Sequence, residues 1–211
     1  MSRSDQQATK NNKHRDTESS KKMSWLLRHG AREQGLAMTD DGWAQIADVL
    51  RVLGLSRDTL DRVVADNAKK RFECDGERIR ACQGHSLGVV VADEIESTWV
   101  LDTERTALVW HGTSVAALDG IARDGICAVS RTHVHCAADP DATVGKRAGV
   151  DVLLGISPVS LRERGEQVFR SPNGVILVRH IAVTSIVAVR ACTRLGESSL
   201  ARARALFSIE S

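Results

Sequence analysis

The sequence predicts an α+β protein with a helical N-terminal part and a strand-rich C-terminal part. Apolar residues follow a helical period up to about residue 65, change to a hairpin pattern near residue 71, and form short strand-like runs beyond residue 106. A chain of 211 residues is long enough for two small lobes. We therefore expect a disordered tail at 1–20, a first lobe at 21–92, a linker at 93–105 and a second lobe at 106–211.

The tail is expected from its composition, because residues 1–20 are polar, lack aromatic side chains and cannot bury enough apolar area to become ordered. A first helix should begin near Ser20, carry Met23 and Leu26 on its apolar face, and end at Gly30.

Two further helices and a hairpin complete the first lobe. Apolar residues at helical spacing predict a helix over 43–53 with Gly54 as its stop, and Ser56 is suited to cap a third helix. Asp75-Gly76 lies between two short strand-like runs, which is typical of a tight hairpin turn. Three short helices followed by a hairpin are the outline of a winged-helix lobe.

The second lobe is expected to be rich in strands. The candidate strands are 107–110, 133–137, 150–156, 174–178 and 186–190. A short helix is expected over 115–123, ending at Gly125, and Asp139-Pro140 is a second candidate helix start.

Composition restricts the possible functions and compartments. The net charge is only +2, so nucleic-acid binding would depend on a local basic patch. Five cysteines without a Cys-x-x-Cys pair are typical of free thiols in a reducing compartment. No apolar run reaches membrane-spanning length and no signal-peptide core is present, so we expect a cytoplasmic protein without a membrane partner.

Basic residues suited to phosphate binding stand far apart in the chain: Arg28-His29, Arg71 after Lys69-Lys70, and Arg131. Guanidinium groups bind phosphate oxygens bidentately and stay charged at any working pH, so the fold would create an anion pocket by bringing these arginines together. Each motif also has a simpler interpretation: Arg28-His29 as cations at a helix C-terminus, and the lysines as a solvated charge run.

Two other cofactor types find little support in the sequence. The Gly-x-Gly-x-x-Gly dinucleotide fingerprint is absent. His133, His135 and Cys136 are close in sequence, but no further ligand cluster has zinc-like spacing, so we expect no metal.

Taken in order along the chain, the motifs resemble the RNA 2′-phosphotransferase family from about residue 20 to about residue 185. The matching segments are Leu26–His29, Gly42-Trp43, Lys69–Phe72, Arg80–Ser86, His111–Thr113, Arg131–His135 and Asn173–Val175.

The resemblance implies a winged-helix-like lobe that binds RNA, followed by a lobe of the ADP-ribosyltransferase type that binds NAD. Family members remove the internal 2′-phosphate left by RNA ligation at a tRNA splice junction, with NAD as co-substrate and no metal. The 2′-phosphate displaces nicotinamide, and the ribose 2″-hydroxyl then attacks the phosphorus, giving the RNA 2′-hydroxyl and ADP-ribose 1″,2″-cyclic phosphate. The family's catalytic set corresponds here to Arg28, His29, Arg71 and Arg131.

The resemblance to ADP-ribosyltransferases also implies a set of NAD-binding residues. The residues expected at the NAD site are His111, Gly112, Thr113, Gly125 and His135. Contacts with flanking RNA phosphates, which any surface cation can make, are expected from Lys69, Lys70, Arg80, Gln83 and His85. His133 is expected to be structural, and no obligate protein partner is expected.

This sequence departs from the family pattern beside the catalytic positions, while all four of those positions match. The departures are Gly30-Ala31 for a Lys-Pro-like pair, Cys82 for Asn, Trp110 for Tyr, Cys136-Ala137 for Leu-Ser, and Ile176 for Trp.

Two other functions remain open at this point. One is an ADP-ribosyltransferase that stops after the first step and caps terminal phosphates of nucleic acids or modifies proteins. Protein-modifying relatives use a late glutamate, whereas here 169–175 contains none and Glu166 lies outside the matched motif. The other is a non-enzymatic nucleic-acid-binding module, which would not account for His111–Thr113 or Arg131.

Overall fold

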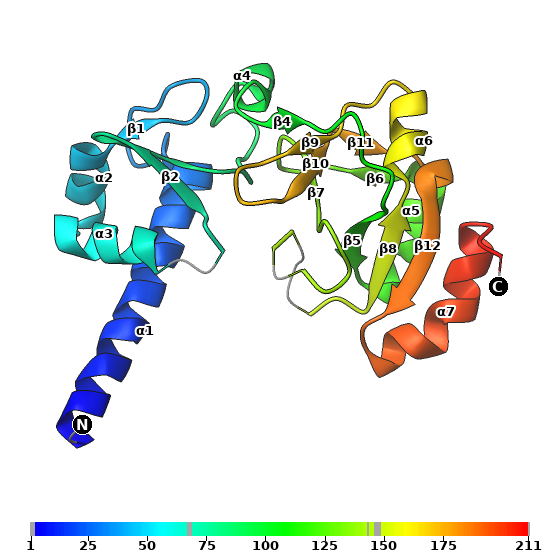
Figure 1. The fold of residues 1–211 in the computed structure, drawn as a ribbon, viewed down its shortest axis with the longest axis horizontal. Helices are drawn as coiled ribbons and strands as arrows, with labels where there is room; N and C mark the ends of the chain where they lie inside the picture. The colour runs from blue at the N-terminus through cyan, green and yellow to red at the C-terminus, as the bar shows by residue number, and fades with distance from the viewer. Residues whose placement is uncertain (1–2, 67–68, 143, 146–148, 211) are drawn as a thin grey trace. The chain divides into compact units, whose positions relative to one another are not determined.

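The structure, a computed structural model, describes residues 3–66, 69–142, 144–145 and 149–210. The chain divides into two compact units, Met1–Ser97 and Thr98–Ser211 (Figure 1), and both helices and strands contribute to each. The expected linker at 93–105 spans this boundary but is not irregular, because it contains most of α4 (Ala92–Glu96) and all of β4 (Val100–Leu101). The prediction of a mixed α+β protein is confirmed.

The first helix is much longer than its sequence suggested. α1 spans Arg3–Trp25 and continues into a π-helical turn, η1 (Leu26–Gly30). The predicted start near Ser20 was therefore wrong, and residues 3–19 of the expected tail are helical, while residues 1–2 lie outside the described part. This segment has no glycine or proline to stop a helix, and Asp16 pairs with Arg62 at 3.1 Å, which ties α1 to α3 (Arg57–Ala65).

Capping residues end and begin the next helices as predicted. α2 (Ile46–Leu53) ends at Gly54, whose φ of 62° is the left-handed conformation that glycine adopts readily. Ser56 caps α3 by accepting a hydrogen bond from the Thr59 N–H. α2 begins three residues later than predicted, because β1 (Ala44–Gln45) pairs with β3 (Arg78–Ala81) instead.

The predicted hairpin is present. β2 (Phe72–Asp75) pairs antiparallel with β3, and the sheet order is β1-β3-β2. The two-residue turn falls one position later than expected, at Gly76-Glu77, with Gly76 at φ 59°. The sheet and the three helices enclose an apolar core that includes Met23, Leu26, Leu27, Ile46, Leu60 and Ile79.

The described residues of the second unit form three antiparallel sheets, with strand orders β4-β9-β10-β7, β12-β8-β5 and β11-β6. Its strands are β5 (Val109–Thr113), β6 (Ile126–Cys127), β7 (Val134–Cys136), β8 (Val152–Ile156), β9 (Phe169–Arg170), β10 (Ile176–Val178), β11 (His180–Ile181) and β12 (Ile186–Ala191). The five predicted strands correspond to β5, β7, β8, β10 and β12. Their apolar residues form the core, and Val109, Leu154, Ile156 and Ile176 are fully buried.

The helices of the second unit were predicted only in part. The helix expected over 115–123 is present as the 3₁₀ turn η2 (Val115–Ala117) and α5 (Leu118–Asp124), and Gly125 ends it as predicted. The helix start at Asp139-Pro140 was wrong: among the described residues, 139–142 form a turn in which Asp139 Oδ1 accepts a 2.9 Å hydrogen bond from the Asp141 N–H.

The remaining helical segments were not predicted. They are α6 (Pro158–Glu163), the 3₁₀ turn η3 (Val183–Ser185) and α7 (Arg194–Leu206). α7 runs alongside β12 (Figure 1), and its capping residue Thr193 accepts a hydrogen bond from the Gly196 N–H at 3.1 Å. Within the described ranges, no helix has the length and apolar character needed to cross a bilayer.

Candidate active-site residues

Arg28 and His29 lie in the π-helical turn at the end of α1. Such turns are wider than an α-helix and recur at functional sites. Leu26 and Leu27 are fully buried and hold the turn in the core, while Arg28 and His29 are only half-buried. The turn therefore holds two polar side chains beside a rigid apolar support, and Nε and Nη2 of Arg28 are themselves buried.

A loop from the distant end of the hairpin holds both of these residues. The Ser86 N–H donates a 2.9 Å hydrogen bond to the Arg28 carbonyl, and Ser86 Oγ lies 2.8 Å from His29 Nδ1. Gly84, at φ 95°, lies against the Arg28 guanidinium: a Cβ added there would be 3.4 Å from Nε. Ser86 thus contacts the main chain of one candidate catalytic residue and the side chain of the next.

Arg71 is connected to the same region through Cys82. The Cys82 N–H donates to the Arg71 carbonyl at 2.9 Å, and the Cys82 thiol donates to the Lys70 carbonyl at 3.2 Å. The Arg71 side chain reaches back to α1, with Nη1 3.5 Å from Ser20 Oγ. In the first unit, Arg28 and His29 thus lie at the end of α1, whereas the Arg71 side chain contacts α1 at Ser20, eight residues before Arg28, and its main chain contacts Cys82.

The Cys82 thiol lies in the electrostatic field of Arg28 and Arg80. Burial, and next the charge of Glu73, raise the pKa of the Cys82 thiol to about 12, while the positive charges of Arg28 and Arg80 lower it. The opposing effect of Arg28 requires its guanidinium to lie near the thiol, because Coulomb interactions weaken with distance. Cys82 is consequently a neutral neighbour of the cationic cluster at working pH.

The five candidate RNA contacts divide into two groups. Lys69 and Lys70 are exposed, whereas Arg80, Gln83 and His85 are buried. Arg80 is also engaged within the first unit: Nε donates to Glu73 at 2.9 Å, Nη1 lies 3.5 Å from Asp41, and the guanidinium stacks over Trp43 with 4.5 Å to the ring centroid. An RNA contact by Arg80 would have to compete with these interactions, whereas the two lysines face solvent.

In the second unit, the structure brings His111 and His135 together. β5 and β7 are joined by paired main-chain hydrogen bonds between Trp110 and Ala137, of 2.9 and 2.8 Å. His111 Nδ1 lies 3.0 Å from the His135 carbonyl. A carbonyl oxygen only accepts, so Nδ1 of His111 carries the proton, and Nε2 of the neutral ring is an acceptor.

The glycines predicted at the cofactor site differ in their surroundings. A Cβ added at Gly112 would be 2.8 Å from Cγ1 of Val150. Because glycine has no Cβ, the Gly112 main chain can lie close to the Val150 side chain, directly after His111. Gly125 lies instead against β11, where an added Cβ would overlap the Ile181 carbonyl oxygen, and its φ is 75°. The surroundings of Gly125 therefore match a packing and chain-turning role.

Thr113 ends β5, and a nearby acidic residue that the sequence analysis did not identify fixes its position. The Asp151 N–H donates to the Thr113 carbonyl at 3.0 Å, and Asp151 Oδ2 accepts from the Val115 N–H at 3.1 Å. Thr193 Oγ1 donates to Asp151 Oδ1 at 3.1 Å. Asp151 has no sequence motif that would have revealed it, whereas Ser86 closes the Arg80–Ser86 motif and could have been assigned from it.

Arg131 is exposed three residues before β7, on the segment that leads to His135. His133, between them, is buried and packs edge-on against Trp99, with 4.9 Å between ring centroids, and against Phe169 at 6.3 Å. These ring contacts agree with its expected structural role.

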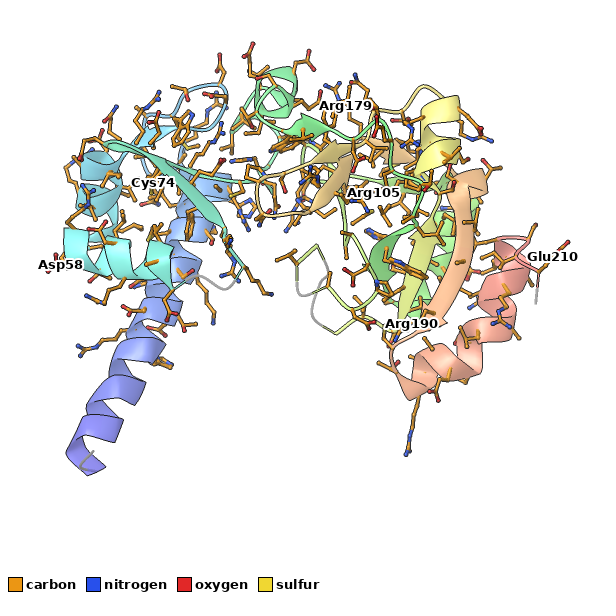
Figure 2. The ribbon with its side chains drawn as sticks, in the orientation of Figure 1. Asp58, Cys74, Arg105, Arg179, Arg190 and Glu210 are labelled. Atoms are coloured by element: carbon orange, nitrogen blue, oxygen red, sulfur yellow. The ribbon has the colours of Figure 1, made fainter. Side chains whose placement is uncertain are left out.

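All five cysteines are free thiols. Cys74, which Figure 2 shows on the hairpin, is exposed together with Cys127 and Cys192, while Cys82 and Cys136 are buried. In the described part of the chain, no group of three His, Cys, Asp or Glu side chains could hold a metal ion.

Comparison with known proteins identifies similar sequences along most of the chain. A model of the "RNA 2'-phosphotransferase, Tpt1 / KptA family" matches residues 14–180. A protein of Pseudomonas savastanoi pv. phaseolicola named "Probable RNA 2'-phosphotransferase" is 38% identical over 189 residues, covering 85% of this chain and 97% of the relative. Proteins with the same name from Escherichia coli O6:K15:H31 and Rhizobium johnstonii are 37% and 33% identical, over 79% and 80% of this chain and 92% and 91% of their own lengths.

Proposed function

The chain belongs to the RNA 2′-phosphotransferase family and is a transferase, and we propose that it moves an internal 2′-phosphate from RNA, of the tRNA splice-junction type, to NAD. The observation that carries this proposal is the family match over residues 14–180, which includes Arg28, His29, Arg71 and Arg131. The products would be the RNA 2′-hydroxyl, nicotinamide and ADP-ribose 1″,2″-cyclic phosphate.

Arg28, Arg71 and Arg131 are assigned to the 2′-phosphate. A phosphomonoester dianion must approach the NAD pyrophosphate against charge repulsion, and fixed guanidinium groups offset that repulsion. In the first step, a phosphate oxygen forms a bond to the anomeric carbon of the nicotinamide ribose as the bond to nicotinamide breaks. The contacts of Ser86 with both Arg28 and His29 support the assignment of these two residues to one phosphate, and Arg71 is assigned from the family pattern.

The second step is a transesterification at phosphorus. The ribose 2″-hydroxyl attacks, the RNA 2′-oxygen leaves and takes up a proton, and negative charge increases on the equatorial phosphate oxygens. We assign Arg131 to this charge and His29 to proton transfer or hydrogen-bond donation, with Ser86 fixing the His29 ring.

His111 is assigned to the ribose hydroxyls of NAD. Its Nδ1 donates to the His135 carbonyl, so its Nε2 can accept a hydrogen bond from a hydroxyl group. Gly112 would let the nicotinamide amide approach the main chain, with Thr113 and His135 beside it. For Gly125, contact with Ile181 supports a role in shaping this unit without touching NAD.

The RNA contacts outside the 2′-phosphate are assigned to Lys69 and Lys70, since both are exposed. We assign a supporting role inside the first unit, beside the loop that carries Ser86, to Arg80, Gln83 and His85. Arg80 already pairs there with Glu73. Unlike base-specific contacts, such lysine–phosphate contacts position the RNA without reading its sequence.

The architecture of each unit is assigned from the family resemblance. We assign the first unit, with three helices and the β1-β3-β2 sheet, to a winged-helix type, and the second unit to the ADP-ribosyltransferase type. Five thiols support activity in a reducing compartment, and we propose the cytoplasm. The arginines supply the positive charge that the chemistry needs, so no metal is assigned.

The test is an assay with NAD and an internally 2′-phosphorylated oligoribonucleotide, comparing the wild type with Arg131→Ala. The variant should slow the second step about 100- to 1,000-fold and accumulate ADP-ribosylated RNA, because a fixed charge is lost from the transition state. Arg123→Gln is a matched control, since its side chain is 75% exposed in the same unit.

Product formation by Arg131→Ala at the wild-type rate would refute the role of Arg131. A wild-type enzyme that stalls at ADP-ribosylated RNA, or that modifies only terminal phosphates, would be an ADP-ribosyltransferase of the capping type. Absence of nicotinamide release with any phosphorylated RNA would refute the proposed function.

A further inference from the structure

Trp25 is a large apolar side chain left in solvent beside the catalytic pair. It is the last residue of α1, directly before the π-helical turn, and 43% of it is exposed. The other tryptophan of the first unit, Trp43, is covered by the guanidinium groups of Arg78 and Arg80. Exposing a lone indole costs hydrophobic free energy, which suggests that its surface has a use.

The indole has a fixed support. Its six-membered ring lies against Gly30, where an added Cβ would overlap Cη2 and Cζ3 and lie 2.8 Å from Cζ2. Gly30 is therefore required for this packing, and it holds the ring across the π-helical turn. A ring held in this way loses little conformational entropy when a flat ligand stacks on its exposed surface.

Cations stand on both sides of Trp25 along the helix. Lys21 and Lys22 are exposed, four and three residues before it, and Arg28 and His29 follow three and four residues after it. Lys21 and Lys22 therefore lie on the same face of α1 as Trp25. Arg28 and His29 follow within the wider π-helical turn that begins directly after Trp25.

This order of charges and aromatic surface fits a nucleic-acid strand. Lysines bind backbone phosphates, and an aromatic side chain stacks on a base exposed from a single strand or loop. If Arg28 and His29 hold the 2′-phosphate, the base of an adjacent nucleotide lies within reach of the preceding helical turn.

We propose that Trp25 is a stacking platform for a nucleobase of the RNA, next to the nucleotide that bears the 2′-phosphate, and that Lys21 and Lys22 bind the backbone phosphate on its far side. This inference rests on the proposed function. It adds an RNA contact in α1 that neither Lys69 nor Lys70 provides.

The test separates stacking from packing with two substitutions at one position. Trp25→Phe keeps an aromatic face, whereas Trp25→Leu keeps an apolar side chain against Gly30 but cannot stack. Trp25→Leu should raise KM for a short 2′-phosphorylated oligoribonucleotide about tenfold and leave KM for NAD unchanged, while Trp25→Phe should change KM for RNA less than about threefold. Circular dichroism and thermal unfolding check that each variant is folded.

The substrate offers a second, independent change. With an oligoribonucleotide made abasic at the nucleotides that flank the 2′-phosphate, the wild type and Trp25→Leu should have the same KM for RNA. Replacing Lys21 and Lys22 by Gln should weaken RNA binding and reduce its salt dependence, and Arg51→Gln, whose side chain is 67% exposed on α2, is the control.

The platform is wrong if Leu and Phe behave alike at position 25, or if the loss in Trp25→Leu persists on abasic RNA. Fluorescence anisotropy with labelled 2′-phosphorylated RNA, measured without NAD, keeps this result separate from the proposed function. A wild type that binds this RNA but forms no product would refute the function, while the affinities of the Leu and Phe variants would still decide the platform.

Discussion

Removing the Ser86 hydroxyl tests how His29 is held. Ser86→Ala deletes the 2.8 Å contact with His29 Nδ1 but keeps the main-chain hydrogen bond to the Arg28 carbonyl, so the loop should remain in place. A neutral hydrogen bond of this kind contributes about 0.5–1.5 kcal/mol, which corresponds to about a 2- to 10-fold lower kcat. This loss is far smaller than the 100- to 1,000-fold loss expected when a charged group that touches the transition state is removed.

The assay is steady-state turnover with separate determination of kcat and of KM for RNA and NAD. Because Ser86 acts through His29, we expect kcat to fall with both KM values unchanged, and Ser86→Thr, which retains a hydroxyl, to recover most of the rate. A loss above about 100-fold would mean that Ser86 touches the reacting phosphate itself. An unchanged kcat would show that the hydrogen bond has no positioning role.

Three further predictions concern packing and ionisation. Gly30→Ala should displace the Trp25 indole and so raise KM for RNA. Chemical unfolding should show an unchanged or higher free energy of unfolding, because alanine favours a helix over glycine by up to about 1 kcal/mol. An unaltered KM for RNA would contradict the stacking platform. Gly196→Ala should lower the free energy of unfolding by about 1–3 kcal/mol, because the added Cβ overlaps the Asp151 carbonyl oxygen. Gly120→Ala is the neutral control, because the space around Gly120 is open. Equal urea midpoints for the two variants would refute this reasoning. Burial raises the pKa of the Cys82 and Cys136 thiols from 9.0 to about 12. Between pH 9.0 and about 12 the thiols of the unfolded chain ionise while those of the folded chain do not, so the free energy of unfolding should fall by about 1.4 kcal/mol per pH unit for each thiol. If this pH dependence persists when both cysteines are replaced by Ala, it has another cause.

Helix ends were predicted correctly where they depend on a capping residue or glycine close in sequence. Gly54, Ser56 and Gly125 end or begin helices where expected, because their conformations and caps involve atoms only a few residues away. The extension of α1 to Arg3 was not predictable in this way, since the Asp16–Arg62 pair joins residues 46 positions apart.

The candidate sites show the same difference. The types of residue at Arg28, His29 and His111 suggested their chemistry, but the hydrogen bond between Ser86 and His29 and the contact of His111 with the His135 carbonyl depend on tertiary structure. Trp25 was not identified because its importance comes from an exposed position supported by Gly30, which helical periodicity does not reveal.

The anchor of the His111 ring has a consequence for how this protein can change. The acceptor is a main-chain oxygen, so any amino acid at position 135 would preserve the ring's tautomer and direction. Mutation at position 135, natural or designed, would therefore change the side chain beside His111 while Nε2 of His111 keeps its direction. The identity of residue 135 can vary independently of the orientation of the His111 ring.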